Sequence, residues 1–299
     1  MKRIIVFVVV LFLVGQAKAN DYFYITYSGL INTYKLRYTI INAEKHYVSV
    51  GTGYDKKPTG TFNIPSEITY PTNNGVTYTV TAVEDLAFSS CGDLISVTIP
   101  NTVTSIGYMA FYNCSSLTSV TIPNSVDSIG GSAFYGCNCL KTLTMGNSVK
   151  SIGTYAFRDC CMLTSIDIPN TVDSIGNNAF NGCSGLTSIN IPDGITNIGN
   201  GTFSGCSRLP SITIPNSVKS IGGGAFAGCK SLTSIEVPNS VTFIANGAFR
   251  GCSSLESITL PFVGDRQYSP TDTCQYPFGF IFGGVSYDGG TRTEQYQTI

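Results

Sequence analysis

The sequence predicts a solenoid of stacked, mainly β coils, and two observations lead to this fold class. The first is a 23-residue repeat in which Phe, Cys and Leu each return at a constant spacing. The second is the short alternation of apolar and polar residues inside every repeat, which is typical of a strand with one buried face. The Phe positions are Phe88, Phe111, Phe134, Phe157, Phe180, Phe203, Phe226 and Phe249. A chain that repeats one short unit in this way is expected to form a repeat architecture.

The strand of each unit can be located in the repeat that begins at Leu117. Val120 and Ile122 alternate with polar residues, so they predict a short strand with its apolar side toward the core. Pro123 cannot donate to a ladder of hydrogen bonds, which ends the strand, and Asn124 favours a turn. One strand per unit is therefore expected.

The second half of each unit returns the chain to the next strand. Val126 and Ile129 are expected to point back into the core. Gly130 is expected to take a backbone angle that other residues resist. The compact segment from Ala133 to Cys137 has the spacing of a helical turn.

Stacking of the coils explains why the same residue types occur at equivalent positions of each repeat. Equivalent residues of neighbouring coils would lie about 4.8 Å apart, so each Phe packs on the next Phe. A residue of the wrong size leaves a void or a clash against both neighbours. One coil cannot bury its own apolar face, so the array is stable only as a stack.

The first residues have the features of a signal peptide. Lys2 and Arg3 precede an apolar run at 4–15, and Ala17-Lys18-Ala19 forms a small-residue cleavage motif. The apolar run is shorter than the roughly 20 residues that span a bilayer, although an uncleaved signal-anchor is the alternative. We expect residues 1–19 to be removed near Ala19 and the mature protein to be secreted or held at the cell surface.

The two ends of the repeat differ from it in composition. Residues 20–79 are rich in Tyr and alternate like strands, which predicts a small β-rich N-terminal cap; a separate ligand-binding domain is the alternative. Residues 80–261 hold the repeats. Residues 262–299 are rich in Gly and aromatic residues, which predicts a C-terminal tail or cap, with an aromatic loop that stacks on sugars as the alternative.

The repeat resembles the BspA-type leucine-rich repeats, whose motif is LxxLxIPxSVxxIGxxAFxxC, over residues 80–261. The runs Phe62–Pro65 and Gly75–Val83 also resemble the segment that precedes the repeats in that family. The resemblance implies a leucine-rich-repeat solenoid, repeat α/β to mainly β, with a parallel sheet on its concave face and short helical turns on the convex side. It also implies adhesion to extracellular matrix proteins or other cells. Ser125 stands where commoner leucine-rich repeats carry a buried Asn.

Composition restricts the partners of the protein. Charged residues make up 12% of the 299 residues and the formal net charge is −1, so no basic surface for nucleic acid is expected. After residue 19 no segment is long and apolar enough to cross a membrane. A surface of Gly, Ser, Thr and Asn suits recognition of extracellular proteins or cell-surface macromolecules, glycans among them.

The cysteines are expected to be core residues rather than a disulfide framework. The eight on the repeat share one core position, and parallel neighbours near 4.8 Å are too far apart for the usual disulfide geometry. Cys139 and Cys161 lie off this column on adjacent coils and could pair, whereas Cys274 has no evident partner. His46 is the only histidine and no zinc-binding pattern occurs, so no metal and no cofactor are expected.

No catalytic residues are predicted. Histidine-dependent chemistry would have to use His46, which lies in the cap, far in sequence from the repeats. The carboxylates of the repeats are scattered without a converging pair, and Gly222–Gly224 has no phosphate-loop spacing. The sequence therefore predicts a protein that is not an enzyme.

The outward positions of the strands are the remaining candidates for function. Two ladders of exposed residues are expected on the concave face, and one explanation is only that Ser and Thr suit strands and keep the face soluble. The functional hypothesis is that this face binds a partner, with partner-specific contacts at Asp167, Asn190 and Glu236. The candidate binding residues are Ser119, Thr121, Thr142, Thr144, Ser165, Asp167, Ser188, Asn190, Ser211, Thr213, Ser234 and Glu236.

These features favour an exported, cell-surface-associated interaction protein that adheres to host or neighbouring-cell macromolecules. The face lacks aromatic residues, so binding is expected to be weak at each site or multivalent. The alternative is a glycan-binding or structural scaffold module that uses the aromatic tail or the N-terminal cap. An ice-binding Thr array is less favoured, because acidic residues interrupt the ladder.

Overall fold

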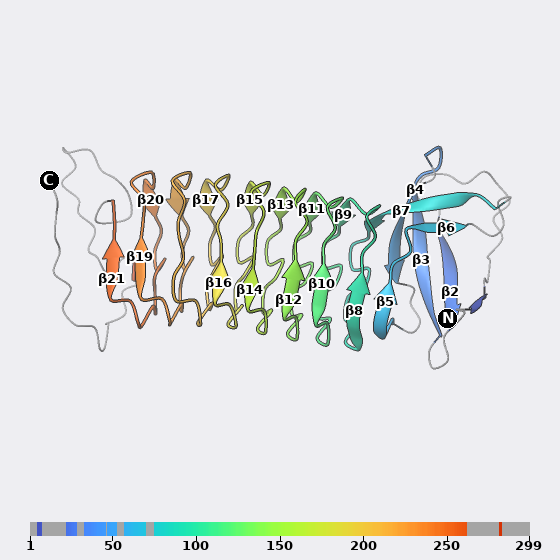
Figure 1. Cartoon of the computed structure of the whole chain (residues 1–299), viewed down its shortest axis with the longest axis horizontal. Helices are drawn as coiled ribbons and strands as arrows, with labels where there is room; N and C mark the ends of the chain where they lie inside the picture. The colour runs from blue at the N-terminus through green and yellow to red at the C-terminus, as the bar shows by residue number, and fades with distance from the viewer. Residues whose placement is uncertain are drawn as a thin grey trace.

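The structure, a computed structural model, describes residues 5–7, 22–28, 33–45, 47–52, 57–69, 75–261 and 281–282. Coils of 23 residues stack side by side along the long axis of the molecule, and a group of longer strands lies at the N-terminal end (Figure 1). The strands of neighbouring coils are parallel, as the repeat predicts. The predicted leucine-rich-repeat solenoid is confirmed in its coils and its parallel strands.

The first column of strands contains the expected strand of each unit. In β10, Ser119 pairs with Ser96 on one side and Thr142 on the other, so the pairing shifts by 23 residues from coil to coil. β5 of the preceding segment joins the same column by pairing with β8. The strands of this column are β5 (Gly60–Asn63), β8 (Leu94–Thr98), β10 (Ser119–Thr121), β12 (Thr142–Thr144), β14 (Ser165–Ile166), β16 (Ser188–Ile189), β19 (Ser234–Glu236) and β21 (Ser257–Thr259).

A second column of strands was not predicted. In most coils a Ser-Ile pair after the turn forms a two-residue strand, with Ser128 paired to Ser105 and to Ser151. Most coils thus have two strand segments, and both place an aliphatic residue toward the core. The strands of this column are β9 (Ser105–Ile106), β11 (Ser128–Ile129), β13 (Ser151–Ile152), β15 (Ser174–Ile175), β17 (Asn197–Ile198), β18 (Ser220–Ile221) and β20 (Phe243–Ile244).

The N-terminal strands continue the second column rather than forming a separate layer. β1 to β4 form an antiparallel run, β4 pairs with β7 in parallel, and β7 pairs with β9 of the first coil. β2, β3 and β4 of this run lie within residues 20–79. Its strands are β1 (Ile5–Phe7), β2 (Tyr22–Ser28), β3 (Thr33–Asn42), β4 (Tyr47–Thr52), β6 (Glu67–Thr69) and β7 (Thr77–Val83).

The core is a set of columns in which like residues stack. The eight repeat Phe side chains are buried, and rings of successive coils lie 5.1 to 5.8 Å apart between centroids and nearly parallel. Phe62 covers the first ring of this column and Phe282 covers the last, both with tilted rings. Burying one such side chain contributes roughly 1.5–3 kcal/mol.

The segment from Ala133 to Cys137 forms turns and not the expected helical turn. Ser132 and Gly136 have positive φ angles of 55° and 74°, which a right-handed helix does not allow. Backbone bonds alternate between turn bonds within the coil and bonds to the next coil, as from the Phe134 N–H to the Ala156 carbonyl at 2.7 Å. The described residues contain no helix, and so none of a length and apolarity that could span a membrane.

Gly130 is required for a different reason from the one predicted. Its φ is not among the positive values; instead, a Cβ there would lie 2.5 Å from the carbonyl carbon of Gly107 in the preceding coil. A Cβ at Gly153 would likewise lie 2.5 Å from the Gly131 nitrogen. Six coils, from Gly107 to Gly222, therefore keep the glycine after the second strand because the backbones of adjacent coils approach closely, whereas the last coil has Ala245 at this position.

A hydroxyl column replaces the buried Asn of commoner leucine-rich repeats. The hydroxyls of Ser125, Thr171 and Ser217 donate to the carbonyl of a residue in the preceding coil, at 2.6 to 2.7 Å. A short hydroxyl reaches only this one carbonyl, whereas an amide could bond to two groups. Ser125 thus has the linking role that the sequence left open.

A polar network links the N-terminal strands to the first coil. Glu84 occupies the place of the coil glycine, and its carboxylate accepts hydrogen bonds from Arg37 and from the Ser49 hydroxyl. At the other end, the Ile281 carbonyl accepts from the Phe249 N–H at 3.0 Å, where a further coil would otherwise supply the acceptor. Ile281 is buried, so the described part of the C-terminal segment covers the last coil.

Candidate binding surface

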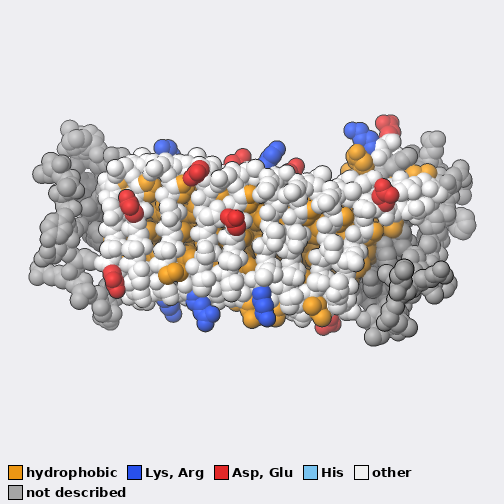
Figure 2. Space-filling view, in the orientation of Figure 1, with side chains coloured by type: hydrophobic (Ala, Val, Ile, Leu, Met, Phe, Trp, Pro, Cys, Tyr) orange, Lys and Arg blue, Asp and Glu red, His pale blue; other side chains and the backbone are white. Residues whose placement is uncertain are grey.

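The outward positions of the first column form the predicted ladders. We call the surface made by these twelve residues and their equivalents in the other coils the strand face. Eleven of the twelve candidate residues are exposed and Asn190 is half-buried. Figure 2 shows one face of the molecule, where charged side chains are few and scattered and hydrophobic bands run between polar ones. Because most residues of the strand face are Ser or Thr, it offers hydroxyls rather than charges to a partner.

The ladder of strand hydrogen bonds is interrupted twice along this face, between β12 and β14 and between β16 and β19. Ser211 and Thr213 are exposed as expected, but their segment forms no strand. In other coils the residue before the first ladder position donates its N–H to the preceding coil, as Thr187 donates to the Thr164 carbonyl at 2.8 Å. Pro210 stands at this place and has no N–H to donate, so the sheet divides between β16 and β19.

Asn190 has a structural role on this face. Its side-chain oxygen accepts from the Ile168 N–H and its side-chain nitrogen donates to the Ile168 carbonyl, both at 2.7 Å. The amide thereby replaces two backbone bonds beyond the end of β14. Because these two bonds hold the side chain along the sheet, Asn190 has only part of its bonding capacity left for a partner.

Asp167 and Glu236 differ from Asn190 because their carboxylates are exposed and unpaired. Neither forms an ion pair within the described residues. Asp167 lies three coils before Glu236, and the interrupted coil at Pro210 lies between them. They are therefore the two charged contacts that the strand face offers, set in a ladder of hydroxyls.

The repeat cysteines are buried thiols, in agreement with the core role predicted for them. From Cys114 onward each thiol donates to the carbonyl of a Phe in the preceding coil, as Cys183 does to Phe157 at 3.1 Å. Burial raises the pKa of the Cys137 thiol to about 12 and that of Cys252 to about 11. These thiols stay protonated and unreactive in the folded protein.

The off-column cysteines are free thiols in the structure. Cys161 is exposed and Cys139 is half-buried, and no disulfide joins them. No cluster of three metal-ligating side chains occurs in the ranges that the structure describes. His46 and Cys274 lie outside the described residues.

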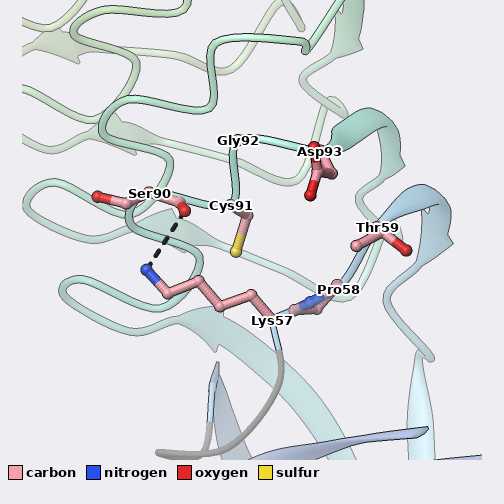
Figure 3. A pocket seen from close by; sticks show the side chains of 7 residues that line it. All are labelled: Lys57, Pro58, Thr59, Ser90, Cys91, Gly92 and Asp93. Atoms are coloured by element: carbon pink, nitrogen blue, oxygen red, sulfur yellow. Dashed lines mark hydrogen bonds between the residues drawn. The ribbon is translucent and has the colours of Figure 1, made fainter. Parts of the chain in front are cut away.

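A small open cavity that the sequence did not indicate lies where the N-terminal segment meets the first coil. It has a volume of about 250 Å³ and is lined by Lys57–Thr59 and by Ser90–Asp93. The Lys57 ammonium donates to the Ser89 carbonyl at 2.6 Å, and Figure 3 shows the Cys91 sulfur pointing toward the Lys57 segment. No Phe carbonyl of a preceding coil is available to Cys91, because the stack begins here.

The surroundings of Cys91 change its acidity. A hydrogen bond with the Cys114 thiol lowers the pKa of Cys91, the charge of Lys57 lowers it further, and burial opposes both. Only 1% of the Cys91 side chain is exposed. The cavity therefore combines an acidified thiol with a cation, but the thiol itself is shielded from solvent.

Thiol labelling should separate these classes of cysteine. When the native protein is treated briefly with a maleimide, we expect labelling of exposed Cys161 first and of Cys139 more slowly. Column thiols such as Cys183 should react only after the protein is unfolded, because they are buried and protonated. Peptide mass spectrometry would measure this order; labelling of Cys183 in the native protein would contradict the buried column.

Comparison with known proteins agrees with the geometry. The family model described as "BspA type Leucine rich repeat region" matches residues 81–206 and 174–263, more than half of the chain. A leucine-rich repeat protein from Bacteroides ovatus ATCC 8483 is 33% identical with a TM-score of 0.63, over 75% of this chain and 63% of its own. The chain thus spans less than two thirds of that protein.

A second solved structure is similar over a larger share of its own length. It is the leucine-rich repeat protein of T. pallidum, which is 29% identical with a TM-score of 0.57, over 65% of this chain and 86% of its own. No curated protein matches the sequence.

Proposed function

Since the chain belongs to the family of BspA-type leucine-rich repeat proteins, we propose that it is an exported, surface-associated protein that adheres to extracellular proteins through its strand face. The observation that carries this proposal is the ladder of exposed hydroxyls, held at constant spacing by the buried core. Extended solenoid faces of this kind are used for binding in other repeat proteins. The signal-peptide pattern of residues 1–19 supports export.

The strand face suits weak contacts that add up along the array. Its residues are small and hydroxylated, so each contact contributes a modest hydrogen bond rather than a buried anchor. Asp167 and Glu236 add charged contacts that set the orientation of the partner. A ligand that spans several coils would gain affinity from their regular spacing.

The alternative function in glycan binding by the C-terminal aromatic residues receives less support. Phe282 packs on Phe249 with centroids 6.5 Å apart, so this ring is used to cover the last coil. Phe278, Phe280 and Tyr287 lie outside the described residues.

A pair of bulky substitutions tests the strand face. We expect the purified protein to bind a panel of extracellular-matrix proteins saturably, and a Ser188→Arg/Ser211→Arg variant to bind about tenfold or more weakly, because the arginines block the ladder. Surface plasmon resonance at graded salt would measure both affinities.

The matched control places the same change away from the strand face. Ser253 and Ser254 are exposed in the loop after Cys252, so a Ser253→Arg/Ser254→Arg variant adds equal charge and should bind like the wild type. Failure of the wild type to bind any protein of the panel, or equal losses in the two variants, would count against the strand face.

A further inference from the structure

The loops after the second column carry an aromatic cluster that lies apart from the strand face. Tyr112 and Tyr135 of adjacent coils meet edge to face with centroids 5.2 Å apart, and Tyr155 of the next coil lies 6.4 Å from Tyr135. Tyr108, in the loop of Tyr112, is 48% exposed. We call Leu86, Tyr108, Met109, Tyr112, Tyr135, Tyr155 and Arg158 the turn-edge patch.

The patch is confined to the N-terminal coils. The position of Tyr112, Tyr135 and Arg158 carries small or amide residues in the next three coils, and Arg250 in the last. The position of Leu86, Met109 and Tyr155 carries glycine in the last three coils. The residues at the position of Tyr112 in these three coils are Asn181, Ser204 and Ala227. The glycines at the position of Leu86 are Gly201, Gly224 and Gly247. The aromatic character therefore follows from particular residues and not from the repeat.

Three of the patch residues occupy a backbone conformation that disfavours them. Leu86, Met109 and Tyr155 have φ angles of 59°, 53° and 60°, in the left-handed region that glycine adopts at no steric cost. The later coils use glycine at this same position with φ of 61° to 65°. Large side chains are thus kept here despite backbone strain, and strained positions of this kind often serve function.

Arg158 supplies the charge of the patch. Its guanidinium carbon lies 5.2 Å from the centroid of the Tyr135 ring and 5.3 Å from that of Tyr155, within the range of a cation–π contact with both rings. The Asp159 carboxylate is 3.5 Å from Nε, too long for a strong ion pair, and Nε is buried without a hydrogen-bond partner. No other ion pair of Arg158 occurs within the described residues, so its terminal N–H groups can bind a carboxylate in two-pronged geometry.

We propose that the turn-edge patch binds a segment of a partner polypeptide that lays apolar side chains on the tyrosines and directs a carboxylate to Arg158. Tyr, Met and Arg are the residues enriched in protein interfaces, and Tyr and Arg dominate their energetic centres. Leu86 and Met109 offer no hydrogen bond to sugar hydroxyls, so a polypeptide fits the patch better than a glycan. This site is separate from the strand face and does not depend on the function proposed for it.

The array itself supplies substitutions that should leave the fold intact. Tyr155→Asn introduces the residue found at the equivalent Asn178, which also has positive φ, and Arg158→Asn introduces the residue of Asn181. Arg250→Asn is the matched control, because Arg250 holds the position of Arg158 in the last coil, where no tyrosine is near it in the repeat. Thermal unfolding followed by circular dichroism would verify that all three variants fold.

The probe is a phage-displayed library of random 12-residue peptides, selected on the full-length wild-type protein. We expect the enriched peptides to share an acidic residue beside apolar residues. The best synthetic peptide should bind the Tyr155→Asn and Arg158→Asn variants about tenfold more weakly and the Arg250→Asn variant unchanged, by isothermal titration calorimetry. Changing the acidic residue of the peptide to its amide should weaken binding to the wild type but not to the Arg158→Asn variant.

Three results would overturn the proposal. These are a selection that enriches no peptide family, peptides that bind the patch variants as tightly as the wild type, and tyrosine-dependent binding of neutral oligosaccharides in place of peptides. The Ser188→Arg/Ser211→Arg variant should keep full peptide binding, so failure of the strand-face function and failure of this site can be told apart.

Discussion

Raising the pH above about 9 is expected to unfold the repeat array, because six buried thiols keep their protons only in the folded state. Burial is the first cause of the raised pKa at Cys137, Cys160, Cys183, Cys206, Cys229 and Cys252. In the unfolded chain these thiols return to an ordinary pKa near 8.5. Below that pH both states are protonated, so this contribution to stability is fully present.

Above the ordinary thiol pKa the unfolded state loses protons that the folded state retains, so the free energy of unfolding falls as pH rises. Each thiol lowers it by about 1.4 kcal/mol per pH unit, and six together by about 8 kcal/mol per unit. The loss continues until the folded thiols themselves ionise, near pH 11 for Cys252 and near 12 for Cys137. Urea unfolding under reducing conditions, repeated from pH 7 to 11, would measure how steeply the free energy of unfolding falls with pH.

A variant that removes two of these thiols provides the control, because tyrosines and lysines also titrate in this range. Cys183→Ala/Cys206→Ala should be less stable at every pH, since each substitution removes packed volume. Its free energy of unfolding should nevertheless fall with pH less steeply than that of the wild type, by about 2.7 kcal/mol per pH unit, because two of six thiols are gone. Equal slopes in the two proteins would mean that the buried thiols do not control alkaline unfolding.

The sequence was sufficient to predict what the stacking enforces. Phe134 and Cys137 must match their equivalents on both sides, so their regular return indicated buried columns, and both residues are buried. Val120 and its alternating polar neighbours predicted the first strand, which the structure confirms. These predictions succeeded because a residue type that recurs at a constant spacing has one physical cause, the need to pack against its equivalents in the neighbouring coils.

The sequence was less informative about the local conformation between these columns. The Ser128-Ile129 strand is two residues long, too short to show an alternating pattern. The segment at Ala133 has helical spacing, but its hydrogen bonds run to the next coil, and a single-coil analysis cannot include those partners. The role of Asn190 was missed for the same reason, because its amide bonds to Ile168 in the preceding coil.

The turn-edge patch could not be predicted from the repeat because its residues depart from the repeat motif. Tyr135 and Arg158 stand at positions that vary from coil to coil, so the constant residues of the repeat gave no indication of them. The informative signal was available in the sequence: large residues in early coils occupy a position where later coils have glycine. Comparing coils column by column, from Tyr155 to Gly201 and onward, would have identified the surface.

The substitution Gly153→Ala is expected to destabilise the protein by about 3 kcal/mol or more, although it adds one methyl group. The added Cβ would lie 2.5 Å from the Gly131 nitrogen and 2.7 Å from its Cα, so it meets backbone that cannot rotate away. Relief requires neighbouring coils to separate, which weakens both strand columns and the Phe stack between them. Overpacking of this kind typically costs 1–3 kcal/mol, and more where the contacts are rigid.

Gly92→Ala is the matched control for this prediction. Gly92 also lacks a positive φ, but the nearest atom to an added Cβ is the Ser115 hydroxyl oxygen at 3.6 Å, an ordinary contact. The free energy of unfolding of the variant should equal that of the wild type or exceed it by about 0.5 kcal/mol, because alanine restricts the unfolded chain. Urea unfolding at pH 7 would compare the two. Similar free energies for both variants would show that the coils can separate at little cost, and that close backbone approach does not fix the glycine of the repeat.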